Sequence, residues 1–131
     1  MYGRVVIAAH KDIADLPNKD GQRIAQQGML WLKRHAPGAV VVCGANKSDK
    51  LIGQVWKALG GHVIVDEPTF ARNITRKDAM RNRDRRVLSH PVDLCISFEI
   101  RGHKGWMALM CEQKNITMQR FDTAHQIVDA D

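Results

Sequence analysis

The chain has 131 residues, 44% of them hydrophobic, and its 20 Lys and Arg residues against 14 Asp and Glu residues give a net charge of +6. This length predicts one domain over residues 1–131, with a core at about 4–121 and a loosely docked tail at 122–131. No apolar run reaches the roughly 18 residues of a membrane span, so we expect no membrane-spanning protein.

The three cysteines, Cys43, Cys95 and Cys111, are odd in number and form no CxxC pair. This pattern argues against a disulfide framework and against a structural zinc site. It predicts reduced thiols in a cytoplasmic protein, and we expect no metal.

Predicted strands and helices alternate along the chain. Apolar runs at residues 4–9, 39–43, 62–65 and 94–98 are typical of buried strands, and the more polar run at 117–121 suits an edge strand. Amphipathic spacing or capping signals predict helices at about residues 20–35, 50–59, 76–88 and 106–114. The predicted N-caps include Ser48 or Asp49 for the second helix and Thr75 for the third. Residues 12–20 are predicted to be irregular.

This order of elements predicts a single α/β domain. We expect an open, mostly parallel sheet of about five strands with helices on both faces. In such a sheet, ligands bind at the carboxyl ends of the strands, where the strand order reverses. The loops that follow the predicted strands are therefore the places to look for a site.

Positive charge is concentrated in residues 72–86, which hold seven Arg and Lys residues against two Asp. The rest of the chain has 13 basic and 12 acidic residues, so it is nearly neutral. Such a segment attracts either the phosphates of a small nucleotide or a nucleic-acid backbone, and the alternative is a solvated helix face that aids solubility. The candidate phosphate or nucleic-acid contacts are Arg72, Arg76, Lys77, Arg83 and Arg85.

The strand-end loops supply further candidates. The turn at residues 44–49 could bring the backbone close to an anion, or it could be an ordinary turn with a capping Ser. Residues 102–105 place a basic pair between two glycines and could likewise cradle an anion. His10 and His103 are candidates for acid–base chemistry because histidine titrates near neutral pH. Glu99 is either a catalytic carboxylate or a rim charge that neutralises Arg101.

Four motifs together resemble the SLOG superfamily, and most closely its small YspA-like branch. They are Cys43-Gly-Ala-Asn-Lys-Ser-Asp49, Arg81-Asn-Arg-Asp-Arg85, Pro91-Val-Asp-Leu-Cys-Ile-Ser-Phe98 and Arg101-Gly-His-Lys-Gly-Trp106. The resemblance covers roughly residues 4–120 and implies a Rossmann-like domain. The site that it implies consists of Gly44, Asn46, Ser48, Asp49, Arg81, Asn82, Gly102 and Gly105.

The resemblance extends more distantly to DprA and Lonely Guy proteins, and this chain departs from the family pattern in places. Residues 99–101 replace the Pro-Gly-Gly approach to the anion loop, and Glu112 is an imperfect match to the acidic residue of Lonely Guy hydrolases. The resemblance therefore implies binding of a nucleotide or nucleotide derivative more than it implies catalysis. Single-domain members of this kind occur in bacteria and in their phages.

Three functions follow in order of preference. The first is a sensor or sequestering domain that binds a nucleotide-derived phosphate ligand at the carboxyl edge of the sheet. The second is a nucleic-acid-binding protein that uses the basic helix at 72–88. The third is an N-glycosidic-bond hydrolase with Glu99 or Glu112 as its carboxylate. We expect no bound cofactor, and the sequence is compatible with a homo-oligomer.

Overall fold

Five strands alternate with four α-helices in the computed structural model, which describes residues 3–124. The strands are β1 (Arg4–Ala9), β2 (Val40–Cys43), β3 (His62–Val65), β4 (Leu94–Ile100) and β5 (Met118–Thr123). The helices are α1 (Asp20–His35), α2 (Lys47–Ala58), α3 (Arg76–Leu88) and α4 (Trp106–Gln113). Two short 3₁₀ helices, η1 (Ile13–Asp15) and η2 (Pro17–Lys19), occupy most of the segment that we predicted to be irregular.

All five strands are parallel and form one sheet in the order β3-β2-β1-β4-β5. Val5 of β1 is in register with Val41 of β2 on one side and with Leu94 of β4 on the other. This sheet confirms the predicted α/β architecture and gives a Rossmann-like fold, with β5 at one edge. The strand order reverses between β1 and β4, and such a reversal is where open α/β sheets bind ligands.

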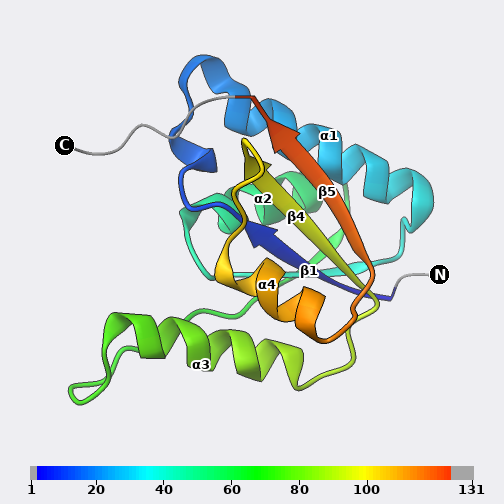
Figure 1. The fold of residues 1–131 in the computed structure, drawn as a ribbon. Coiled ribbons are helices and arrows are strands. Elements are labelled where there is room, and N and C mark those ends of the chain that lie inside the picture. Colours follow the sequence, from blue (N-terminus) through cyan, green and yellow to red (C-terminus); the bar gives the residue numbers. More distant parts are fainter. Residues whose placement is uncertain (1–2, 125–131) are drawn as a thin grey trace.

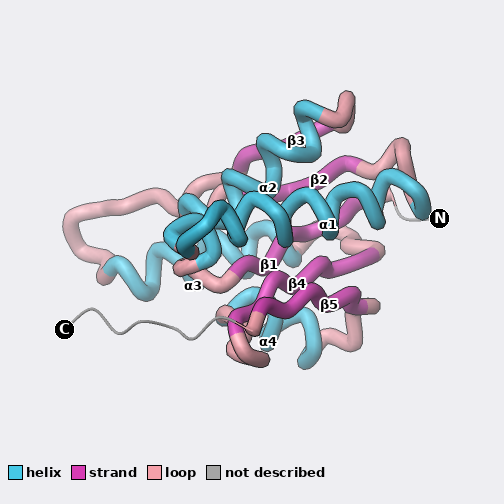
Figure 2. Tube along the Cα trace, turned by 90° about the horizontal axis from the view of Figure 1, so that it is seen from above, coloured by secondary structure: helices cyan, strands magenta, loops and turns pink. Residues whose placement is uncertain are grey.

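The sheet carries helices on both faces, as predicted. Side chains of β1 alternate between the two faces, so Val5 and Ile7 join a core with α1 and α2, whereas Val6 and Ala8 join a core with α3 and α4. Figure 1 shows α4 in front of the sheet and α1 behind it, and Figure 2 shows the helices on either side of the strands from above.

Helix α3 is the polar helix at the rim of the fold. It begins after Thr75, whose hydroxyl accepts a hydrogen bond of 3.0 Å from the backbone N–H of Asp78, as its predicted N-cap role requires. Its N-terminal end and the loop before it project away from the sheet (Figure 1). Ala79, Val87 and Leu88 supply its buried apolar contacts. Arg83 and Asp84 are buried as well, whereas the other polar side chains of the helix are at least partly exposed.

Two strand boundaries lie beyond their predicted positions. Strand β4 continues to Ile100, and all seven of its residues are buried, so Glu99 lies inside the strand rather than in a loop. Strand β5 continues to Thr123, so Asp122 belongs to the sheet and not to a tail. Most of the predicted tail, residues 125–131, lies outside the described residues.

All three cysteines are buried and none forms a disulfide with another. Burial raises the pKa of the Cys43 thiol to about 12, so this thiol is unreactive near neutral pH. Within residues 3–124, no helix combines the length and the apolar character that crossing a membrane requires. Nor do three His, Cys, Asp or Glu side chains of this range gather as metal ligands would.

Candidate functional site

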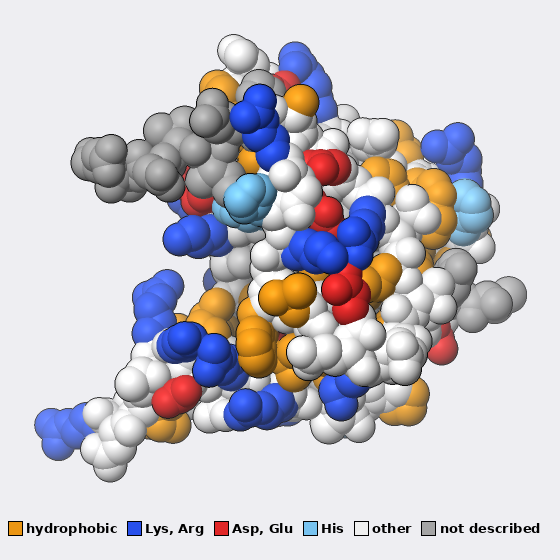
Figure 3. Space-filling view, viewed as in Figure 1, with side chains coloured by type: hydrophobic (Ala, Val, Ile, Leu, Met, Phe, Trp, Pro, Cys, Tyr) orange, Lys and Arg blue, Asp and Glu red, His pale blue; other side chains and the backbone are white. Residues whose placement is uncertain are grey.

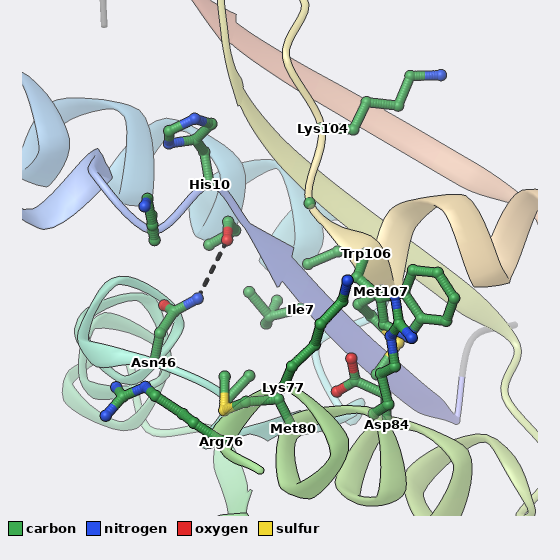
Figure 4. A pocket seen from close by; sticks show the side chains of 16 residues that line it. Ile7, His10, Asn46, Arg76, Lys77, Met80, Asp84, Lys104, Trp106 and Met107 are labelled. Atoms are coloured by element: carbon green, nitrogen blue, oxygen red, sulfur yellow. Dashed lines mark hydrogen bonds between the residues drawn. The ribbon is translucent and has the colours of Figure 1, made fainter. Parts of the chain in front are cut away.

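A pocket of about 740 Å³ opens at the carboxyl end of β1, beside the reversal of strand order. Four segments surround it: the end of β1 with the residues that follow, the β2–α2 turn, helix α3, and the start of α4 (Figure 4). We name this space the switch-point pocket. Its lining residues are Ile7, Ala8, Ala9, His10, Lys11, Ala45, Asn46, Arg76, Lys77, Met80, Arg81, Asp84, Lys104, Gly105, Trp106 and Met107.

The deeper wall of the switch-point pocket is apolar. Ala8 comes from β1, Met80 from α3 and Met107 from the first turn of α4. Trp106 stands beside them, 39% exposed, and the Arg81 guanidinium lies over its ring at 4.5 Å from the centroid. Pockets of this size and lining suit an organic ligand with a flat apolar part.

The opening of the switch-point pocket is basic. Lys11, Arg76, Lys77 and Arg81 line it, and none of these four forms an ion pair with a carboxylate of residues 3–124. Figure 3 shows Lys and Arg side chains along the border of the hollow beneath the upper part of the molecule. Lys104 contributes less, because its ammonium is turned toward Glu112 at 2.5 Å. The pocket therefore offers strong attraction for an anion.

His10 lies at the end of β1 as a neutral donor. Its Nδ1 accepts a hydrogen bond of 3.1 Å from the backbone N–H of Asp12, so the proton of the neutral ring sits on Nε2. Burial lowers the pKa of His10, and the neighbouring His103 and Lys11 lower it further against the opposing charge of Asp12. His10 can therefore donate to a ligand without adding a charge.

Arg83 does not reach the pocket with the other basic residues of α3. We expected a phosphate contact, but its side chain is completely buried. Its Nε donates to the carbonyl of Asp66 at 2.6 Å, and its Nη1 donates to Asp84 at 3.0 Å. The Asp49 carboxylate lies 3.9 Å from Nη2. Arg83 thus ties α3 to the residue after β3 and to the first turn of α2, and this role replaces the expected one.

The β2–α2 turn is organised by Asp49, which faces inward and not toward a ligand. The Asp49 carboxylate accepts hydrogen bonds from the backbone N–H groups of Gly44, Ala45 and Asn46 at 2.8 to 3.1 Å. Burial raises the pKa of Asp49, and these three hydrogen bonds oppose that shift. Because the three N–H groups are already used, they are not available to hold a phosphate.

Asn46, rather than Ser48 or Asp49, is the N-cap of α2. Its Oδ1 accepts from the backbone N–H of Asp49 at 2.9 Å, and its Nδ2 donates to the carbonyl of Ala9 at 3.3 Å (Figure 4). The Ser48 hydroxyl is buried and bridges Ala14 N–H and the Lys11 carbonyl. Both expected caps thus serve the fold, and only Asn46 of the three lines the pocket.

Gly44 has φ +123°, and its close approach is to protein rather than to a ligand. A Cβ on Gly44 would lie 2.5 Å from the carbonyl oxygen of Asp66. Gly102 has φ +76° with open space around it and does not line the pocket, whereas Gly105 does and forms the N-cap of α4. Asn82 is exposed and accepts from Arg85 at 3.4 Å. Of the site that the resemblance implied, the pocket brings together Asn46, Arg81 and Gly105.

The two candidate catalytic carboxylates lie together but not in the pocket. Glu99 is buried on β4 and accepts a hydrogen bond of 2.8 Å from the Ser97 hydroxyl, so it is not the expected rim charge beside Arg101. Arg120 lies 3.7 Å from Glu99 and also donates to Glu112. The ammonium of Lys104 and the guanidinium of Arg120 hold the pKa of Glu112 below its usual value. Both carboxylates are thus engaged by cations of the protein.

Several lining residues escaped the sequence analysis as site residues, notably Lys11, Met80, Asp84 and Trp106. A signal for part of them exists in the sequence. Lys77, Met80, Arg81 and Asp84 recur at spacings of three and four, which places them on one face of a helix. The candidates Arg72, in the loop before α3, and Arg85, on α3, are exposed and do not line the pocket.

Comparisons with known proteins found no match among protein-family models, curated proteins or solved structures. The resemblance to the SLOG superfamily therefore stays a prediction from the sequence. The chemistry of the pocket is therefore the basis for assigning a function.

Proposed function

We propose that the chain binds a nucleotide or nucleotide-derived phosphate ligand in the switch-point pocket and acts as a cytoplasmic sensor or sequestering domain. One observation carries the proposal: a pocket beside the strand reversal combines an apolar wall with four cations that have no carboxylate partner in residues 3–124. A base or another flat group suits the wall, and phosphate oxygens suit the cations.

The resemblance to SLOG proteins supports the same place. It implied ligand contacts from the β2–α2 turn, from the Arg-Asn pair of α3 and from the loop before α4, and each of these segments contributes a residue to the pocket. The support comes from the segments rather than from every residue, because Gly44, Ser48 and Asp49 hold the turn together.

Calorimetric titration of the purified protein with nucleoside mono- and diphosphates tests the proposal, together with native mass spectrometry for ligands that copurify. Arg81→Ala should weaken binding about tenfold, since a hydrogen bond to a charged group contributes roughly 1.5–3 kcal/mol. Arg85→Ala is the matched control, because Arg85 lies on the same helix but outside the pocket. If neither method detects a nucleotide, or if both variants lose the same affinity, the proposal is wrong.

Nucleic-acid binding is a second candidate because α3 and the loop before it carry cations outside the pocket. Arg72 and Arg85 are exposed, and Phe70, 58% exposed, lies beneath the Arg76 guanidinium at 5.6 Å from its ring centroid. A nucleic-acid partner predicts steep salt dependence and a large effect of Arg85→Ala. A small ligand in the pocket predicts the reverse pattern.

An N-glycosidic-bond hydrolase has less support. Glu99 and Glu112, its candidate carboxylates, are absent from the pocket lining and are bound to Ser97, Lys104 and Arg120. A substrate in the switch-point pocket would meet neither carboxylate directly.

A further inference from the structure

Asp84 is the one carboxylate that lines the switch-point pocket among the described residues. It sits on α3, one turn after Met80 and Arg81, and only 5% of the residue is exposed. Figure 4 shows its carboxylate projecting from α3 into the space on the same side as Lys77. An acid in this position needs an explanation, because it opposes the binding of the anion that the surrounding cations attract.

The two oxygens of Asp84 have different surroundings. Oδ1 accepts a hydrogen bond of 3.0 Å from Nη1 of Arg83, whereas Oδ2 accepts none from any residue in the range 3–124. In this range, the side-chain atoms that are both buried and without a hydrogen-bond partner are Arg4 Nε and Arg83 Nη2, so the unpaired Oδ2 of Asp84 is accessible to solvent. It is therefore an acceptor that remains open toward the pocket.

Arg83 fixes this acceptor in place. Its guanidinium is completely buried and is held by the hydrogen bond from Nε to the carbonyl of Asp66 at 2.6 Å. Because Arg83 is anchored on one side, the carboxylate of Asp84 is held at one position on the other. An acceptor that is fixed before binding loses little freedom when a ligand donates to it.

We infer that Asp84 is a specificity-determining residue, which accepts a hydrogen bond from a hydroxyl or N–H group of the ligand and disfavours bare polyanions. The inference rests on the proposed nucleotide binding and narrows it. An ionised carboxylate accepts hydrogen bonds and donates none, so it selects ligands that carry a donor beside their phosphate. A ribose hydroxyl and an amino group of the base both meet this requirement.

The alternative is that Asp84 only balances the buried charge of Arg83. The variant Asp84→Asn separates the two roles. Arg83 should attract the amide oxygen, so the amide NH₂ group turns toward the pocket and an acceptor is replaced by a donor. A ligand hydroxyl or amino group then meets a donor, whereas a bare anion gains one. A purely structural role predicts no such opposite effect on two ligands.

Calorimetry with adenosine monophosphate and with pyrophosphate tests the inference. In Asp84→Asn, affinity for adenosine monophosphate should fall about tenfold, while affinity for pyrophosphate should rise or stay unchanged. Asp78→Asn is the matched control: it removes the same charge from the same helix but lies outside the pocket, so it should leave the ratio of the two affinities unchanged. Thermal unfolding confirms that each variant is folded.

Two further nucleotides identify the donor. Deoxyadenosine monophosphate lacks one ribose hydroxyl, and purine riboside monophosphate lacks the amino group of the base. The native protein should bind one of these two nucleotides more weakly than adenosine monophosphate, and Asp84→Asn should affect that nucleotide least. The group that this nucleotide lacks is then the donor that Asp84 accepts from. If Asp84→Asn does not fold, Asp84→Glu keeps the charge but displaces the carboxylate, and it should weaken nucleotide binding without strengthening pyrophosphate binding.

The outcomes separate the two proposals. If the native protein binds nucleotides but Asp84→Asn lowers the affinities for adenosine monophosphate and pyrophosphate equally, or changes neither affinity, the role inferred for Asp84 is wrong. The proposal of nucleotide binding then still holds. If the native protein binds pyrophosphate as tightly as adenosine monophosphate, Asp84 confers no selectivity and the inference is also wrong. If the native protein binds no nucleotide, both proposals fall together.

Discussion

Replacing Arg83 with Met should destabilise the fold far more than replacing its neighbour Arg85. Methionine has a similar length and fills the buried space, so the change removes mainly the charge and the hydrogen bonds of the guanidinium. It leaves the Asp66 carbonyl without the 2.6 Å hydrogen bond from Nε and the Asp84 carboxylate without its 3.0 Å partner. Asp49 is less affected, because three backbone N–H groups still hold it.

The expected loss follows from these contacts. Removing one partner of a buried ion pair costs about 3–5 kcal/mol, much of it the desolvation of the charge left behind. For a domain of this length, each kcal/mol of lost stability lowers the melting temperature by about 4 °C, so we expect the melting temperature to decrease by roughly 15 °C. Arg85→Met changes an exposed residue and should stay within about 0.5 kcal/mol of the native protein.

A double-mutant cycle with Asp84→Asn tests the reasoning by urea unfolding at neutral pH. Removing the charges of both partners costs less stability than leaving one buried charge without its partner. The double variant should therefore be about 2 kcal/mol more stable than the sum of the two single losses predicts. A loss below about 1 kcal/mol in Arg83→Met would refute the assignment. So would additive losses in the double variant, because they would mean that Asp84 does not depend on Arg83.

The remaining predictions concern the backbone and pH. Gly44→Ala should lower the free energy of unfolding in urea by about 3 kcal/mol, since a positive φ adds to an overlap with Asp66. Gly102→Ala, at a residue with a positive φ but open space around it, should lower it by about 1 kcal/mol. Equal losses in the two variants would contradict the packing argument. Burial lowers the pKa of His10, so the folded state binds its proton less readily than the unfolded chain, and stability should fall as pH decreases below about 6.5. His10→Gln should flatten that decrease, and nitrogen NMR should show the Nε2–H tautomer at pH 7 in the native protein; a ring protonated at pH 7 would contradict both expectations.

Local patterns were sufficient to predict most of the fold. The apolar runs that become β1 and β2 are continuous because both faces of the central strands are covered. Thr75 marked the start of α3 because its hydroxyl has a local partner three residues later. The end of β4 was missed for the opposite reason. Glu99 looks like a loop residue in the sequence, and its burial depends on a hydrogen bond from Ser97, two residues earlier, and on Arg120 of the neighbouring strand β5. The approach of Arg120 is set by the strand order and has no local signal.

The site was predicted to the level of segments but not of side chains. The β2–α2 turn resembles an anion loop in composition, yet Asp49 uses its N–H groups, and no local signal distinguishes a carboxylate that caps its own turn from one that awaits a ligand. Lys11 and Trp106 follow different strands, and their approach depends on the order β3-β2-β1-β4-β5. Strand order is set by contacts across the whole chain, so it could not be deduced from either loop.

The net charge of residues 72–86 overstates the attraction for a single ligand, because the basic side chains of this segment point in different directions and only some of them reach the pocket. Arg83 shares the buried face of Ala79 and Val87, four residues away on either side, and Arg86 donates to Asp66 at 2.6 Å. Arg72 and Arg85 face outward.

The cations of α3 that remain for the pocket are Arg76, Lys77 and Arg81, and Asp84 lines the same pocket from the same helix. A ligand with three or more phosphate charges and no donor would match the cations but meet the carboxylate. A nucleoside phosphate satisfies both, since its phosphate and its hydroxyl or amino groups lie several ångströms apart. The position of each charge on α3, rather than the sum of the charges, is therefore what favours a nucleotide over a simple polyanion.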